Sequence, residues 1–288
     1  MGESPRGGGA GRYLENGSRP PTPMGHEGTT IPHPPANQDA SMSDHEHHSA
    51  DEGHRPASSR RDLVVRAGHS GDVDEAVAGL ADSDATVRAA AIGAVVRLGR
   101  AGALDGSDTV DAVVAGLADR DPDVRRRAAN EAARWAGADG GADRDPDGRW
   151  TRHLADALLH RLDGGDEAQV LEVVAFACGE LDLDGDDLAE ARTAVVDALA
   201  TQAETHEDHL CRESAVAALG SIGDVRGLDA VIAACGDRAN VRRRAVLALA
   251  AFDDPAASAA MRRLLDDRDL QVRQAAEELL AIESGEAL

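Results

Sequence analysis

The chain has 288 residues and a formal net charge of −23, because 53 acidic side chains oppose 30 basic ones. This balance argues against nucleic-acid binding, since the neutralisation of phosphates supplies most of the non-specific affinity for nucleic acids. No stretch approaches the roughly 20 uninterrupted apolar residues of a membrane-spanning helix, so we expect no membrane insertion.

The first 60 residues are rich in glycine, proline, serine and histidine and have no apolar period. This composition predicts a disordered tail, residues 1–60, ahead of a folded region at 61–284. The sequence from Met42 looks like an ordinary protein start, so we hypothesise that residues 1–41 are an over-extended start, which a native peptide from upstream of Met42 would refute. Because no framework fixes the tail histidines, a solvated tail is favoured over a metal site at His45, His47, His48 and His54.

A repeated helical unit follows, and its clearest copy runs from Cys211 to Asp224. With Cys211 as position zero, apolar residues fall at positions 0, 4, 7, 8 and 11, which is one face of a helix. Gly223 ends this helix, because glycine accepts a left-handed turn. Position zero of the five further copies is Val87, Val124, Val170, Val241 and Val272.

Each copy is the second helix of a predicted pair, so the chain reads as six pairs after a capping half-repeat at 60–67. An insertion rich in glycine and aspartate, residues 137–149, precedes the third pair. The predicted pairs are Val73–Leu80 with Val87–Leu98, Val110–Leu117 with Val124–Trp135, Leu154–Leu162 with Val170–Leu181, Leu188–Leu199 with Cys211–Ile222, Leu228–Cys235 with Val241–Phe252, and Ala256–Leu265 with Val272–Ile282.

The copies share a core of the form Asp-x-x-Val-Arg-x-x-Ala. It is complete in three of them, as Asp84, Val87, Arg88 and Ala91, as Asp121, Val124, Arg125 and Ala128, and as Asp269, Val272, Arg273 and Ala276. Elsewhere Cys211 replaces the valine, Arg238 replaces the acid, and Leu171 replaces the arginine, which makes the third copy the most deviant. The pattern resembles the HEAT-like repeat family, in particular the short repeats first described in phycobilin lyases, over about three quarters of the chain. The resemblance implies an all-α solenoid of about six helix pairs.

The acid and the arginine of this core have separate physical roles. The acid stands where a helix N-cap belongs, so we expect its carboxylate to accept a backbone N–H group. The arginine lies in the first turn, where the helix dipole disfavours a cation, so its recurrence indicates a fixed anionic partner. An acidic cap in the adjacent repeat is the favoured partner and would give a ladder of ion pairs. The alternative is that some of these arginines bind carboxylates or phosphates of another molecule.

Enzymes with related repeats give two alternative functions. A deoxyhypusine hydroxylase type would need His-Glu dyads on inner helices, but here they fall in the tail (His26-Glu27 and His45-Glu46) or in a loop (His206-Glu207). A phycobilin lyase activity would be implied by the family name alone. The sequence therefore predicts no catalytic residues, no metal site and no cofactor.

Two further patterns were weighed for metal chemistry. Aspartates at 143, 145 and 147 imitate the start of a calcium loop, but Leu154 occupies the position of its bidentate glutamate, and the aspartates at 182, 184 and 186 share this weakness. Solvated surface loops are therefore favoured. The three cysteines, Cys178, Cys211 and Cys235, fall at core-facing positions without metal-ligand spacing, as expected of buried thiols in a reducing compartment.

Arginine is the sole cation besides histidine, and acids are in large excess. This composition looks like that of a salt-adapted cytoplasmic protein from a haloarchaeon, whose self-repulsion is screened by salt, so low salt should destabilise the fold. Family resemblance and the lack of a catalytic constellation favour a scaffold or adaptor for protein partners. Haloarchaeal relatives of this repeat type include adaptors in signalling, taxis among them.

The partner surface is expected on the concave side, which second helices line in HEAT-like solenoids. Position six should face outward, and in the third copy it is Phe176, a large aromatic in a chain with 2% aromatics. An apolar centre with an arginine rim is the usual anatomy of a binding site. An alternative is that the insertion before the third pair folds back and covers Phe176. The predicted partner-binding residues are Val173, Phe176, Arg126, Arg127, Asn130, Arg134, Arg243 and Arg244.

Overall fold

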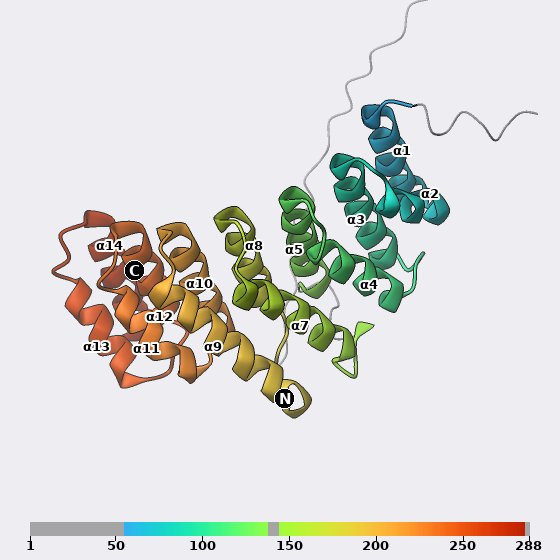
Figure 1. Ribbon diagram of the computed structural model, residues 1–288. Helices are drawn as coiled ribbons and strands as arrows, with labels where there is room; N and C mark the ends of the chain where they lie inside the picture. Colours follow the sequence, from blue (N-terminus) through green and yellow to red (C-terminus); the bar gives the residue numbers. More distant parts are fainter. Residues whose placement is uncertain (1–54, 138–143, 286–288) are drawn as a thin grey trace, which may run out of the picture. The chain divides into compact units, whose positions relative to one another are not determined.

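A computed structural model describes residues 55–137 and 144–285, and that part of the chain contains thirteen α-helices and no strand. The predicted all-α architecture of six helix pairs is confirmed (Figure 1). The first helices are α2 (Val73–Ala78), α4 (Gly106–Leu117), α7 (Arg149–Gly164), α9 (Ala189–Thr205), α11 (Leu228–Ala234) and α13 (Pro255–Leu264). The second helices are α3 (Ala85–Arg100), α5 (Pro122–Ala136), α8 (Ala168–Gly179), α10 (His209–Ile222), α12 (Ala239–Leu249) and α14 (Leu270–Glu283). Short 3-10 turns are η2 (Gly79–Ala81), η3 (Asp186–Leu188) and η4 (Val225–Gly227).

The helices form two layers. Each second helix packs against the next second helix, from α3 on α5 through to α12 on α14, while α4, α7, α9 and α11 pack in turn as a layer of first helices. The first described helix is α1 (Ala57–Ser70). It packs on α3 in the same way as one second helix packs on the next. This helix begins four residues inside the predicted tail. The predictions for residues 1–54, including the start hypothesis and the tail histidines, lie outside the described residues.

Small residues let neighbouring second helices approach closely. Glycines at position nine of α8 and α10, Gly179 and Gly220, face alanines at position seven of the following helix. A Cβ atom added at Gly220 would lie 2.8 Å from the Cα atom of Ala248, and one at Gly179 would lie 2.9 Å from the Cα atom of Ala218. Because these contacts are with backbone, a larger side chain would have to push the helices apart.

The predicted ladder of ion pairs is confirmed for the arginines of four copies. In each rung both guanidinium contacts to the aspartate are between 2.6 and 2.8 Å: Arg88 with Asp119, Arg125 with Asp166, Arg212 with Asp237, and Arg242 with Asp267. The acceptor is the aspartate one or two residues before the N-cap residue of the next second helix, and not the cap itself as predicted. These arginines are therefore held inside the fold and do not present their charge to a partner.

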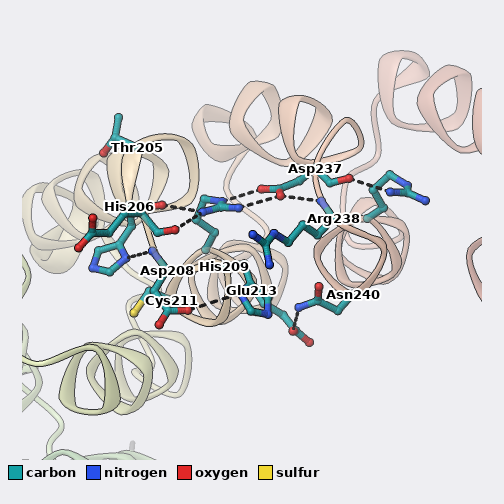
Figure 2. A network of polar contacts seen from close by, with 12 residues as sticks. Thr205, His206, Asp208, His209, Cys211, Glu213, Asp237, Arg238 and Asn240 are labelled. Carbon is teal, nitrogen blue, oxygen red and sulfur yellow. Dashed lines mark hydrogen bonds and ion pairs between the residues drawn. The ribbon is translucent and has the colours of Figure 1, made fainter.

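The turn between α9 and α10 shows how capping and ladder are combined (Figure 2). Asp208 is the N-cap and accepts the backbone N–H of Leu210 at 2.8 Å, as predicted. The Nδ1 atom of His206 accepts the backbone N–H of Asp208 at 3.0 Å. Arg212 donates to the carbonyl oxygen of His206 at 2.7 Å and reaches across to Asp237. One turn thus begins its own helix and links it to the next repeat.

Within the described residues the ladder is interrupted once, between the third and fourth repeats. Leu171 stands where the other copies have arginine, and His206 stands where the other turns have the ladder aspartate. Both line a pocket of about 560 Å³ between α7, α8 and α9. Both members of the ion pair are thus replaced at this position. His206, like the ladder aspartate in other turns, accepts the backbone N–H of a residue that caps the next helix.

Position eleven was predicted to be core, and this is confirmed for four of the copies, while Ile222 in the fourth copy is only partly buried and packs against the core. Leu98, Trp135, Leu181 and Phe252 are at most 8% exposed. The prediction was wrong for Ile282, which is 63% exposed. It lies one residue out of register on α14, and no described helix follows α14 to cover it.

Candidate partner-binding face

The second helices expose one side of their layer, which carries positions two, three, six and ten of each copy and is called here the second-helix face. Position six was predicted to face outward, and its two large apolar side chains do so: Phe176 is 50% exposed and Leu247 is 47% exposed. Gly93 is the buried exception, because the guanidinium group of Arg127 lies over it.

Phe176 borders a groove of about 480 Å³ that runs over α10 from α8 to α12, called here the Phe176 groove. Its floor is made by small residues of α10, such as Ser214 and Ala217, and its rim carries three glutamates, Glu172, Glu180 and Glu213. Burial, reinforced by the charges of Asp208 and Glu213, raises the pKa of Glu172. The groove is therefore acidic, with an aromatic side chain at its edge.

A second groove, of about 510 Å³, runs over α3 from α1 to α5 and is called here the basic groove. Its floor is again small, with Ala89, Ala90 and Gly93 on α3. Four arginines and two aspartates line it, together with an exposed valine and an asparagine: Arg61, Arg97, Arg126, Arg127, Asp121, Asp123, Val65 and Asn130.

The structure separates residues that the sequence had grouped into one patch. Phe176 and the arginines of α5 share the second-helix face but line two different grooves. Three glutamates and Arg244 line the groove beside Phe176, and the rim of α5 arginines around Phe176 stays a prediction. Val173 is only partly exposed, because it packs against the core.

The remaining predicted arginines take part in local ion pairs and hydrogen bonds. Arg126 pairs with Asp123 at 2.8 Å, and Arg244 lies 3.5 Å from Glu213 across the Phe176 groove. Arg243 donates to the side-chain oxygen of Gln271 at 3.0 Å. Asn130 donates to the carbonyl oxygen of Arg126 at 3.1 Å. Arg126 and Arg243 are exposed, whereas Asn130 and Arg244 are partly buried.

Glu131, buried beneath this face, is one of the residues that the sequence interpretation missed. It occupies position seven, where the other copies have alanine or leucine, and it is only 2% exposed. Arg127 pairs with it at 2.8 Å, and Arg134 lies 3.4 Å away. Burial raises the pKa of Glu131, against the opposing effect of Arg127 and Arg134. The signal in the sequence that could have identified Glu131 was an acidic residue at a core position of an otherwise regular repeat.

Glu131→Gln is expected to be more stable than the unmodified chain at neutral pH. The folded-state pKa of Glu131 lies above its unfolded value, so the native state binds the proton more tightly and loses stability as pH rises through that pKa. Glutamine keeps the shape but cannot ionise, so the stability difference should grow between about pH 4 and pH 7. Thermal unfolding of both chains across this range measures it; a difference that is constant with pH would contradict the assignment.

Comparison with known proteins supports the repeat assignment. Residues 196–281 match the family model for HEAT repeats. No curated protein matches the sequence of this chain. The match begins within α9 and ends within α14, so a HEAT-like repeat is supported by sequence from the fourth to the sixth pair, as the resemblance implied. The phycobilin lyase subtype and the haloarchaeal origin stay predictions.

Solved structures with the same fold are helical-repeat proteins. An engineered protein aligns with a TM-score of 0.51 at 23% identity and covers 74% of this chain and 99% of its own. A designed armadillo repeat protein aligns with 0.52 at 16%, covering 72% of this chain and 97% of its own. Another designed armadillo repeat protein, in complex with the peptide (KR)4, aligns with a TM-score of 0.53 at 16% identity and covers 73% of this chain and 98% of its own. At these identities the likeness shows the fold alone.

Some of the residues considered for enzyme and metal chemistry lie in the described part of the chain. His206 and Glu207 lie in the turn between α9 and α10, where His206 serves the helix cap; the dyads in the tail lie outside the described residues. In the described part of the chain, no three histidine, cysteine or acidic side chains are grouped as metal ligands. Burial raises the pKa of the Cys178 thiol to about 12 and that of Cys235 to about 11, so both are weak nucleophiles at neutral pH.

The described part of the insertion does not cover Phe176. The guanidinium carbon of Arg144 lies 4.8 Å from the ring centroid of Trp135, and Asp145 accepts the backbone N–H groups of Trp150 and Thr151 at the start of α7. Asp143 lies outside the described residues, so the calcium-like pattern is seen only in part. No helix of the described chain is long and apolar enough to cross a membrane.

Proposed function

We propose that this protein is a non-catalytic interaction scaffold that binds a segment of a protein partner along the second-helix face. The observation that carries the proposal is Phe176, which is 50% exposed at the edge of a groove although aromatics make up only 2% of the chain. Leu247, 47% exposed at the same position two second helices further on, extends the apolar contact. Exposed large apolar side chains beside a groove are typical of interaction sites.

The repeat fold supports the same function, because helical-repeat solenoids commonly act as protein-interaction scaffolds. One structure with this fold is a designed armadillo repeat protein in complex with the peptide (KR)4. In this chain the glutamates Glu172, Glu180 and Glu213 line the Phe176 groove. Their charge favours a partner segment with basic residues around an apolar anchor.

Composition supports a proposal for the cellular setting. The chain has an excess of acidic residues and contains arginine but no lysine, a composition that fits a salt-adapted protein of a haloarchaeal cytoplasm. We propose an adaptor role there, with signalling components, those of taxis among them, as the partner class that the resemblance implies.

Phe176→Ala is expected to leave the chain folded and to remove its partner. A half-exposed side chain contributes little to the core, whereas truncating a central anchor commonly costs binding about 2 kcal/mol or more. The measurement is co-purification at native salt from cells that make the protein, with circular dichroism as the folding check. Val225→Ala is the matched control, because Val225 is 64% exposed but lies in η4, beside the first helices. A folded Phe176→Ala protein that keeps every partner would refute the proposal.

A further inference from the structure

The basic groove carries the opposite charge to the chain around it. Four arginines and two aspartates line it, in a chain whose net charge is −23. Both aspartates are engaged locally: Asp121 accepts the backbone N–H of Asp123 at 3.0 Å, and Asp123 pairs with Arg126 at 2.8 Å. Even with the buried Glu131 that pairs with Arg127, three acids oppose four arginines, so the groove keeps an excess of positive charge.

Two of the four arginines have no ion-pair or hydrogen-bond partner among the described residues. Arg61 on α1 and Arg97 on α3 are both exposed and both line the groove. A third, Arg127, is fixed by the buried Glu131 at 2.8 Å and lies over Gly93. The groove thus offers one guanidinium group held by Glu131 and two exposed ones, of which Arg97 also acts electrostatically on Glu131, around an apolar floor. Guanidinium groups match carboxylates in geometry and bind them in paired hydrogen bonds.

The contrast with the Phe176 groove makes this charge specific to one place. Both grooves run over a second helix with a small-residue floor, but three glutamates line the Phe176 groove. A carboxylate-rich segment would be repelled there and attracted to the basic groove. Charge therefore divides the second-helix face into two sites of opposite sign.

We infer that the basic groove is a docking site for an acidic segment of a protein partner, with an apolar residue on the alanine floor and carboxylates on Arg61, Arg97 and Arg127. The inference rests on the proposed scaffold function and names the chemistry of one partner segment. The probe is a fluorescein-labelled peptide of two leucines flanked on each side by three aspartates. Its binding to the full chain is measured by fluorescence anisotropy, at the lowest salt concentration at which circular dichroism shows the chain folded.

The expected result is binding that depends on this groove. Arg61→Glu with Arg97→Glu should weaken the probe's Kd about tenfold or more, since both charges are exposed and unpaired. The matched control, Arg262→Glu with Arg263→Glu on α13, makes the same charge change among the first helices and should change Kd less than about twofold. Phe176→Ala should also change the Kd of this probe less than about twofold, because Phe176 lines the other groove.

Five results would overturn the inference. The probe does not bind, or both double variants weaken its binding equally. Alternatively, one of three competitors binds more tightly than the probe: the same peptide with lysines in place of the aspartates, a short single-stranded DNA, or a peptide of residues 41–54, which would make the chain's own tail the occupant. If the probe fails while Phe176→Ala still loses the partner, the inference falls and the scaffold function stands.

Discussion

Asp267→Ala is expected to lower the free energy of unfolding by about 3 kcal/mol. Its partner Arg242 has a side chain that is only 5% exposed, so removing the carboxylate leaves a buried guanidinium without its anion. Asp267 also accepts the backbone N–H of Asp269 at 2.8 Å, a contact that shapes the start of α14. Urea unfolding followed by circular dichroism measures the loss.

The pH dependence of this rung has a definite sign. The hydrogen bond from Arg242 holds the pKa of Asp267 below its usual range. A lowered folded-state pKa contributes stability that is present above the unfolded pKa, about 4, and is lost as pH falls through the folded value. The cost of Asp267→Ala should therefore shrink in acid. A cost that stays the same from pH 7 to pH 3 would contradict the role of the carboxylate charge.

The chain supplies its own control for this rung. At the interruption, Leu171 and His206 replace arginine and aspartate together. Arg242→Leu combined with Asp267→His copies that pair and removes the buried charge, so it should be more stable than Asp267→Ala alone. Replacing a buried ion pair by packed side chains is often close to neutral. A double variant less stable than the single one would mean that the rung does not explain the loss.

Gly220→Val is expected to destabilise the chain by about 2 kcal/mol, because it would force a side chain into the close contact between α10 and α12. A Cβ atom at this position would lie 2.8 Å from the Cα atom of Ala248, so α10 and α12 would have to separate. Thermal unfolding measures the loss. Gly164→Val is the matched control, because nothing lies within 4 Å of a Cβ atom added there, at the end of α7. Equal effects at both positions would show that backbone entropy, and not packing, dominates.

The architecture could be predicted from the sequence because the repeat carries its own signals. Apolar periodicity located each second helix, and the acids before Val87, Val124, Cys211 and Val272 do cap their helices. The recurrent arginine predicted the ladder, since a cation in the first turn of a helix needs an anion nearby. The exact acceptor was missed, because two acids lie within two residues of each other before α5, α8 and α14, and spacing alone does not separate their roles.

The candidate site was predicted less well, for a physical reason. Position six identifies outward side chains within one helix, which is how Phe176 was found. A groove, however, spans three helices, so its composition depends on which positions of neighbouring copies face each other. This is why Arg61, Arg97 and Glu131 were missed and why the arginines of α5 were assigned to Phe176. The sequence shows that Glu131 stands where the other copies have alanine or leucine, but it does not show that the side chain is buried.

The central claim is that partners bind the second-helix face, and site-specific photo-crosslinking tests it most directly. A photo-reactive residue would be introduced in place of Phe176 or Leu247 on this face, and in place of Val77 or Val225 beside the first helices; all four are exposed. We predict protein adducts from positions 176 and 247, formed at native salt in cells that make the protein, and none from positions 77 and 225. Adducts from positions 77 and 225 alone, or equal adducts from all four, would contradict the claim.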